Sequence, residues 1–270
     1  MSKSGAKLAV IGFGAMGRAL TQALLERGVF AAADVVVSDI EQAKQRAAAE
    51  LGVRAAANNS EAARGAETVL LAVKPNTVGR VLDEMRPVLD ASQLVVSIAA
   101  GVTIRSIESH LPEGSPVVRV MPNTPALVGA GASAFALGKS SQAEHARRVS
   151  DMLSAVGMAI EVPEELLDAV TGLSGSGPAY VYVIIEALSD AGVSEGLPRA
   201  VSNALAAQTV FGAAKMVIET GEDTVKLREA VTSPGGTTVA GIAELEKSGL
   251  RAAITNAVQA ATRRSKELAG

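Results

Sequence analysis

Cysteine and tryptophan are absent from the 270-residue chain, and only two histidines are present. The lack of cysteine excludes disulfide bonds and thiolate metal sites. We predict that His110 and His145 are surface residues, because both stand among polar neighbours. This argues against a histidine metal site and against a Ser–His catalytic pair, so we expect no metal site.

Aromatic residues make up only 2% of the chain, whereas 48% of the residues are hydrophobic. A core must therefore consist mainly of Ala, Val, Leu and Ile. The net charge of −3 argues against nucleic acid as a partner. No run approaches the about 18 apolar residues that a membrane-spanning helix needs. The N-terminal run is short and glycine-rich, which indicates a first strand rather than a signal peptide. We expect a soluble, cytoplasmic protein that binds no membrane.

Short β-branched runs alternate with helical periodicity in the first part of the chain, which predicts βαβ units and a parallel sheet. The predicted strands cover residues 7–11, 34–38, 67–73, 93–99, 115–121, 131–137 and 158–162. After Pro163 only helical patterns remain, at residues 177–191, 198–220, 225–231, 238–247 and 251–268. We therefore predict an α/β fold: a doubly wound, mostly parallel Rossmann-type domain (residues 1–162) and an all-helical domain (residues 163–270). The alanine-rich helices lack bulk for a thick core, which favours packing against a second copy of the chain.

A G-x-G-x-x-G pattern follows the first predicted strand and opens a helix. In the dinucleotide-binding interpretation, Gly12 makes the turn, Gly14 admits the pyrophosphate, and Gly17 lets helix and strand pack closely. Asp39 stands about 20 residues further on, at the end of the second strand, where an acid binds the ribose 2′-hydroxyl. This favours NADH over NADPH, although Ser38 remains a candidate for a 2′-phosphate.

Three further loops follow strands at the edge of the sheet where ligands of this fold bind. Lys74 is the one charged residue of the first loop, and whether it faces a ligand or solvent stays open. Small residues at 99–101 would let a nicotinamide ring lie against the backbone. Asn123 and Thr124 either orient a ligand or act as turn residues.

In the helical part, a sharp break at Pro234, Gly235 and Gly236 separates two helical runs. We predict that Thr237 or Thr238 caps the second helix, whose free N–H groups suit a carboxylate or a phosphate. A plain connector is the alternative. Residues 173–180 predict a second Gly-rich loop at a helix start, and a tight helix–helix connection is the alternative.

Taken together, these stretches resemble the pyrroline-5-carboxylate reductase family over nearly the whole chain. The motifs are VIGFGAMG, LLAVKPNTV, VVSIAAGVTI, VRVMPNTPALVGAG, GLSGSGPAYVY and LREAVTSPGGTTVAGI. The resemblance implies a Rossmann-type domain with a helical dimerisation domain, often as a ring of five dimers. It also implies reduction of 1-pyrroline-5-carboxylate to L-proline with NADPH or NADH, the last step of proline biosynthesis.

By this resemblance, contacts to the cofactor fall on Phe13, Gly14, Ala15, Met16, Ser38 or Asp39, Asn59, Ala72, Val73, Lys74, Pro75, Ala99, Ala100 and Gly101. The substrate carboxylate falls on Ser233, Gly236, Thr237 and Thr238. Thr238 is implied as the catalytic hydrogen-bond partner of the ring nitrogen, either donating a proton or only orienting the ring. Asp39 departs from the Ser, Asn or Arg of some family members.

Two alternatives remain open from the sequence. The first is a reductase similar to the β-hydroxyacid dehydrogenases, which use a lysine of the helical domain. Lys215 and Lys226 are the candidates by position, although neither adjoins a Gly-rich loop. The second is a non-catalytic nucleotide-sensing protein, in which the SPGGTT loop would have no evident purpose.

Overall fold

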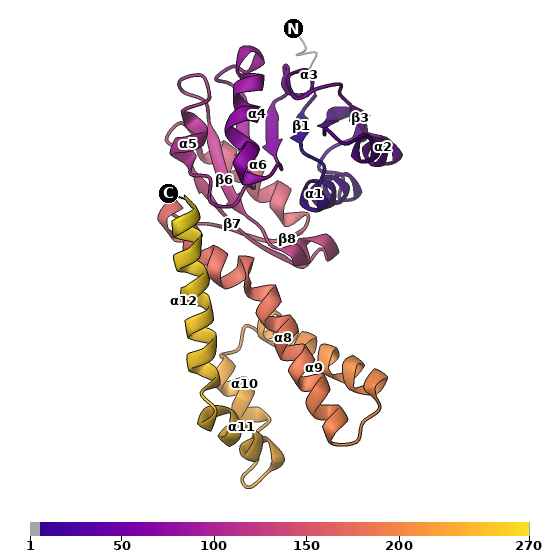
Figure 1. The fold of residues 1–270 in the computed structure, drawn as a ribbon, viewed down its shortest axis with the longest axis vertical. Coiled ribbons are helices and arrows are strands. Elements are labelled where there is room, and N and C mark those ends of the chain that lie inside the picture. Colours follow the sequence, from indigo (N-terminus) through magenta and orange to yellow (C-terminus); the bar gives the residue numbers. More distant parts are fainter. Residues whose placement is uncertain (1–5, 270) are drawn as a thin grey trace. The chain divides into compact units, whose positions relative to one another are not determined.

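The computed structural model describes residues 6–269 of the chain. These residues form two compact units: residues 6–176 with 260–269, and residues 177–259. The first unit carries all strands of the described residues, and the second is helical (Figure 1).

Within the described residues, eight strands form one sheet in the order β3-β2-β1-β4-β5-β6-β7-β8. Neighbouring strands run parallel except for β6 and β7. This order is doubly wound and places a switch point between β1 and β4. The predicted fold class is confirmed. The strands are β1 (Leu8–Ile11), β2 (Val35–Ser38), β3 (Arg54–Ala55), β4 (Thr68–Leu71), β5 (Leu94–Ser97), β6 (Val117–Met121), β7 (Gly131–Leu137) and β8 (Gly157–Glu161).

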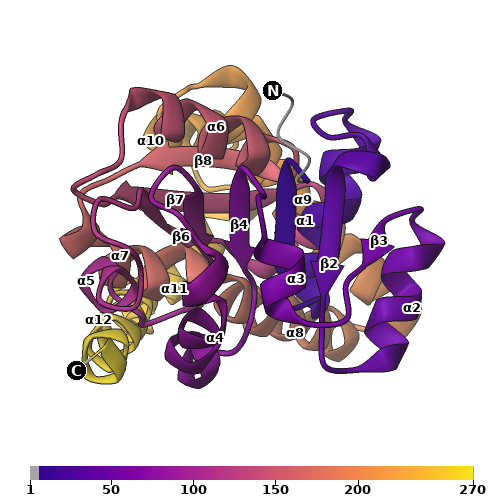
Figure 2. The same cartoon turned by 90° about the horizontal axis from the view of Figure 1, so that it is seen from above.

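Helices cover both faces of the sheet (Figures 1 and 2). Side chains of β1 alternate between the faces, with Leu8 and Val10 in one buried cluster and Ala9 and Ile11 in the other. The first cluster packs against α1 (Ala15–Glu26), α2 (Gln42–Glu50) and α6 (Ala143–Ser154). The second packs against α3 (Asn59–Ala63), α4 (Val78–Met85), α5 (Ile104–Glu108) and α7 (Leu167–Val170).

The second unit is built on a helical hairpin, α8 (Gly177–Ser194) and α9 (Arg199–Thr220). The Ser202 hydroxyl donates to the Ser189 carbonyl oxygen at 2.7 Å, and both side chains are buried. Two shorter helices follow, α10 (Thr224–Ala230) and α11 (Thr237–Lys247). The last helix, α12 (Leu250–Ala269), begins in the second unit and ends in the first.

The helices of the second unit expose a large apolar surface. The exposed side chains of α9 include Leu205, Phe211 and Ile218, and Ile218 is 80% exposed. Exposed apolar surface on this scale marks an association site. By length and composition alone, α9 is also the one helix among the described residues that could cross a membrane, which by itself is weak support for a membrane span.

The predicted division between residues 162 and 163 falls just after the last strand. The compact units divide later, between Ser176 and Gly177, because α7 packs on the sheet through the fully buried Leu167. A π-helical turn, Thr171–Gly175, joins α7 to the start of α8. As a domain boundary, residue 163 stays a prediction.

Gly157 and Gly114 both have a positive φ, which strains any other residue, but only at Gly157 would a Cβ also collide with neighbouring backbone. A Cβ on Gly157 (φ +146°) would lie 2.1 Å from the Gly131 carbonyl oxygen, in the β7–β8 pair. At Gly114 (φ +84°), apart from the two adjoining residues, no described residue has an atom within 4 Å of such a Cβ. We expect Gly157→Ala to lower the free energy of unfolding by more than about 3 kcal/mol, and Gly114→Ala by about 1–2 kcal/mol. Urea titration at one protein concentration checks this, and equal losses would contradict it.

Candidate functional site

The turn after β1 brings the backbone of two neighbouring strands together. Gly12 has φ +93°, and a Cβ there would lie 2.7 Å from the Ala72 carbonyl oxygen, just beyond β4. A Cβ on Gly17 would lie 2.4 Å from the Gly12 carbonyl oxygen. Both positions therefore require glycine on steric grounds. In the described part of the chain, no other segment comes within 4 Å of a Cβ on Gly14, so the approach to that residue is open.

Helix α1 begins directly at this turn, with Gly14 as its N-cap. Within the described chain no side chain caps it, and its first turn carries no acid. The first N–H groups, including those of Ala15 and Met16, therefore remain available, and they lie at the positive end of the helix dipole. This arrangement suits a pyrophosphate.

The strand ends align at one edge of the sheet. In the register, Ile11 of β1 lies opposite both Ser38 of β2 and Leu71 of β4, and Leu71 lies opposite Ser97 of β5. The residues that follow these strands therefore share one edge. The structure thus brings the predicted segments Gly12–Gly17, Ser38–Asp39, Ala72–Pro75 and Ala99–Gly101 to the carboxyl edge of the parallel strands.

Asp39 joins the end of β2 to the glycine turn. Its Oδ2 accepts from the Phe13 N–H at 2.7 Å, and its Oδ1 accepts from the Glu41 N–H at 2.9 Å. The side chain is only 7% exposed. The carboxylate thus orders the glycine turn, and it also lies at the strand end where the sequence predicts the ribose to bind. The sequence spacing indicated only the second of these roles.

The predicted cofactor residues Ser38 and Asn59 contact each other. The buried Ser38 hydroxyl donates to Asn59 Oδ1 at 2.8 Å, and Asn59 Nδ2 donates to Glu84 Oε2 at 2.9 Å. Asn59 is the first residue of α3 and is half-buried. This chain of hydrogen bonds holds the end of β2 against α3 and α4.

The remaining cofactor loops differ in exposure. Lys74 is exposed, and Pro75 starts a short 3₁₀ turn. Ala99 is buried, whereas Ala100 is exposed. Gly101 has φ +75°, and a Cβ there would lie 3.6 Å from the Leu268 carbonyl oxygen in α12. The last turns of α12 thus contact the loop that is predicted to carry the nicotinamide.

Asn123 acts as a structural turn residue. Its Nδ2 donates to the Ser174 carbonyl oxygen at 3.0 Å, and its Oδ1 accepts from the Ala132 N–H at 2.9 Å. With 8% exposure and both ends of its amide used, it links the loop after β6 to β7 and to the π-helical turn.

In the second unit, the break before α11 is a type II turn. The Gly236 N–H donates to the Ser233 carbonyl oxygen at 2.9 Å, with Pro234 and Gly235 (φ +69°) between them. The predicted threonine cap is wrong. The N-cap is Gly236, whose backbone is extended, and Thr237 and Thr238 are the first two residues of the helix. No described side chain caps α11, so its first N–H groups remain available.

The predicted Gly-rich loop at residues 173–180 is also wrong, whereas the predicted helix start is confirmed, because α8 begins at Gly177 with Pro178 in its first turn. The π-helical turn and α8 form a nearly continuous helical segment, in which the Ser176 N–H donates to the Thr171 carbonyl oxygen at 2.8 Å. A π-turn accommodates one extra residue without a loop, and such turns are frequent at functional sites.

The two histidines have structural partners. His110 Nδ1 lies 2.7 Å from Asp83 Oδ1. His145 Nδ1 accepts from the Gln142 N–H at 2.9 Å at the start of α6, and its side chain is only 15% exposed. The surface position predicted for His145 is therefore wrong in part, because the ring completes a capping box.

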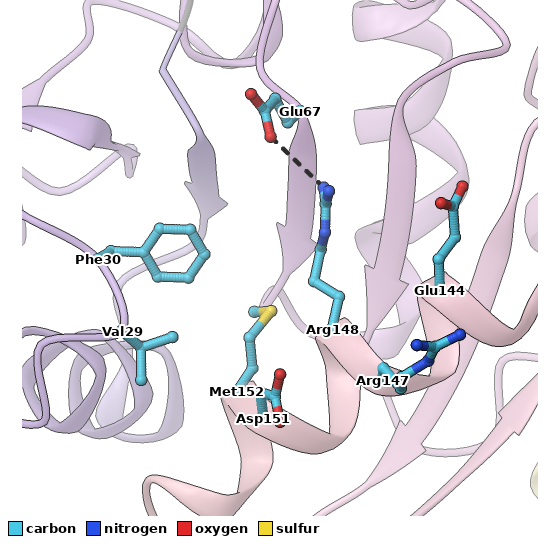
Figure 3. A pocket seen from close by; sticks show the side chains of 8 residues that line it. All are labelled: Val29, Phe30, Glu67, Glu144, Arg147, Arg148, Asp151 and Met152. Carbon is cyan, nitrogen blue, oxygen red and sulfur yellow. Dashed lines mark ion pairs between the residues drawn. The ribbon is translucent and has the colours of Figure 1, made fainter.

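A shallow cavity of about 510 Å³ lies elsewhere on the first unit. Figure 3 shows Arg148 pointing toward Glu67, 3.6 Å away, with Phe30 and Met152 nearby. Glu67 directly precedes β4, so the cavity lies at the amino ends of the strands. The cavity is therefore not the candidate cofactor site, because the glycine turn lies at the opposite edge of the sheet, at the carboxyl ends of the strands.

Comparisons with known proteins agree with this geometry. Residues 164–268 match the family model "Pyrroline-5-carboxylate reductase dimerisation", and residues 7–101 match "NADP oxidoreductase coenzyme F420-dependent". A pyrroline-5-carboxylate reductase of Methanosarcina acetivorans is 46% identical, with 97% of each chain covered. The chain belongs to the pyrroline-5-carboxylate reductase family. The family and the enzyme class, an NAD(P)H-dependent oxidoreductase, are thereby confirmed.

Solved structures of this family extend the agreement to three dimensions. A pyrroline-5-carboxylate reductase from Coxiella burnetii is 37% identical and covers 99% of this chain and 100% of its own, with a TM-score of 0.94. A Plasmodium falciparum family member with NADP bound is 33% identical, covers 98% of each chain and has a TM-score of 0.86. The match to a dimerisation model supports the predicted self-association.

The lysines of the dehydrogenase alternative lie in surface ion pairs. Lys215 Nζ is 3.5 Å from Glu219 Oε1, and Lys226 Nζ is 3.3 Å from Glu222 Oε2. Both lysine side chains are more than half exposed, at 54% and 72%. These contacts are typical of solvated helix faces. They favour a pyrroline-5-carboxylate reductase over a reductase similar to the β-hydroxyacid dehydrogenases, which would need a lysine at the substrate.

Glycine positions in the turn after β1 test the cofactor site. We expect Gly14→Ala to keep the unfolding free energy within about 0.5 kcal/mol of wild type but to raise the NADH dissociation constant at least about tenfold, because its Cβ enters the open approach. Gly17→Ala should also lower stability, by about 1–3 kcal/mol, because its Cβ meets the Gly12 backbone. Fluorescence titration and urea unfolding measure both quantities. Unchanged NADH binding in Gly14→Ala would contradict the assignment.

Proposed function

We propose that the chain reduces 1-pyrroline-5-carboxylate to L-proline with NADH or NADPH. The cofactor is assigned to Gly12–Gly17, Ser38, Asp39, Asn59, Ala72–Pro75 and Ala99–Gly101, and the substrate carboxylate to Ser233, Gly236, Thr237 and Thr238. The observation that carries the substrate assignment is the uncapped N-terminus of α11 behind a rigid type II turn. Backbone N–H groups there bind an anion without any basic side chain.

Few ionisable groups are needed for this reaction. The nicotinamide supplies the hydride when bound. The protein has to hold the carboxylate at the α11 N-terminus and present a hydrogen-bond donor to the imine nitrogen. Thr238 is half-buried in the first turn of α11, and its hydroxyl is the donor that we assign. Protonation of an imine from water makes a strong general acid unnecessary, and orientation becomes the main contribution of the protein.

The assembly and location form part of the proposal. The exposed apolar faces of α8 and α9 fit a homodimer through the helical unit. Five such dimers would make the decamer that the resemblance implies. A biosynthetic role of this kind fits a cytoplasmic location.

Formation of proline tests the function, and Thr238 tests the site. Purified protein should convert 1-pyrroline-5-carboxylate to proline with NADH. We expect Thr238→Ala to lower kcat/KM for the imine about 10- to 100-fold, the value of a lost hydrogen bond to a charged partner. Thr238→Ser should retain most activity because it keeps the hydroxyl.

Thr255→Ala is a matched control, because Thr255 is an exposed helical threonine of α12 outside the proposed site. Its steady-state kinetics should equal those of the wild type. Absence of proline at saturating NADH and NADPH would refute the function. An equal loss of NADH affinity in Thr238→Ala would instead move that residue to the cofactor.

Asp39 should set a preference for NADH. Asp39→Asn removes the charge and keeps a side-chain oxygen that can accept from a backbone N–H. We expect it to raise the NADPH-to-NADH ratio of kcat/KM about tenfold, the effect of about 1.4 kcal/mol of charge repulsion. Asp39→Ser is too short to reach the Phe13 N–H, so it should also lower kcat/KM with both cofactors. Glu50→Gln, at the far end of α2, is the control and should leave the ratio unchanged. A ratio that does not move in Asp39→Asn would show that Asp39 does not face the ribose.

A further inference from the structure

A cation stands beside the carboxylate that is assigned to the ribose. Lys44 Nζ lies 3.8 Å from Asp39 Oδ2 and 2.5 Å from Glu41 Oε1. The Lys44 side chain is 34% exposed, whereas that of Glu41 is 59% exposed. Lys44 is therefore shared between a nearly buried carboxylate and a solvated one, at the end of β2.

The position of Lys44 opposes the field of its helix. It lies in the first turn of α2 (Gln42–Glu50), where the positive end of the dipole disfavours a cation. The hydrogen bond that Lys44 donates to the Glu41 carboxylate is the largest influence that raises the pKa of Lys44, and Asp39 adds to it. The ammonium group therefore stays charged at neutral pH. The negative charges of Glu41 and Asp39 offset its unfavourable position at the positive end of the helix.

We propose that Lys44 binds the 2′-phosphate of NADPH and that Glu41 competes for it, so that this pair sets the degree of preference for NADH. The inference rests on the proposed cofactor site, because the 2′-phosphate replaces the hydroxyl assigned to Asp39. An ammonium group has three donors and reaches a phosphate as a compact point charge. It offsets the repulsion between the phosphate and Asp39 once it leaves Glu41.

The Glu41 side chain can be removed without disturbing the turn. The contact of Glu41 with Asp39 comes from its backbone N–H, which any residue retains. The Glu41 side chain itself is exposed, and it pairs with Lys44. Glu41→Gln therefore releases Lys44 from Glu41, whereas the 3.8 Å contact between Lys44 and Asp39 and the Phe13–Asp39–Glu41 backbone contacts stay in place. The alternative to the proposal is that Glu41 and Lys44 form an ordinary surface ion pair. Such a pair would stabilise α2 slightly and would not affect the choice between NADH and NADPH.

A double-mutant cycle with Glu41→Gln and Lys44→Gln tests the proposal in the full-length enzyme. Glu41→Gln should raise kcat/KM for NADPH about two- to fivefold, the value of a solvated ion pair, with little change for NADH. Lys44→Gln should lower kcat/KM for NADPH about tenfold or more, the value of a charged hydrogen bond. The double variant should match Lys44→Gln, because Glu41 acts only through Lys44.

Direct titration of both cofactors separates the possible failures. If Glu41→Gln raises NADPH affinity equally with and without Lys44, Glu41 acts by its own charge and the proposal is wrong. If both single variants leave the NADPH-to-NADH ratio of dissociation constants unchanged, the pair is an ordinary surface ion pair. If neither cofactor binds to the wild type, the proposed function fails first.

Discussion

The close approach of backbone at the end of β1 is the constraint on which the rest of the first unit depends. Gly12 and Gly17 leave no room for a Cβ, so the loop after β4, the glycine turn and the start of α1 meet directly. Asp39 adds the end of β2 through the Phe13 N–H. The result is an uncapped helix N-terminus beside a nearly buried carboxylate, which is what a dinucleotide with a free ribose hydroxyl requires.

The substrate loop assigned in the second unit uses the same chemistry. A rigid Pro–Gly turn delivers Gly236 to the start of α11, and the donors that we propose are again backbone N–H groups. This reliance on the backbone explains why a chain without cysteine and with two structurally engaged histidines suits an oxidoreductase. Since the cofactor carries the redox step, the side chains have only to select and orient.

Much of the fold could be predicted, because alternating strand and helix patterns and glycine spacing are local signals. Local signals also caused the errors. Gly and Ser at 173–180 indicate a break, yet a π-helical turn absorbs them, and Thr237 and Thr238 look like caps although Gly236 takes the extended cap geometry. The two-residue strand β3 is too short to show a period. The Phe13–Asp39 and Ser38–Asn59 contacts join residues far apart in sequence, so no spacing could reveal them.

The most direct test of the proposed chemistry follows the hydride itself. The protein would be given 1-pyrroline-5-carboxylate with NADH that carries deuterium on the transferred face of C4, and the proline would be examined by mass spectrometry. The account predicts proline with a single deuterium at the carbon of the former C=N bond, formed in step with NADH oxidation. Unlabelled proline, or NADH oxidation without proline, would contradict it.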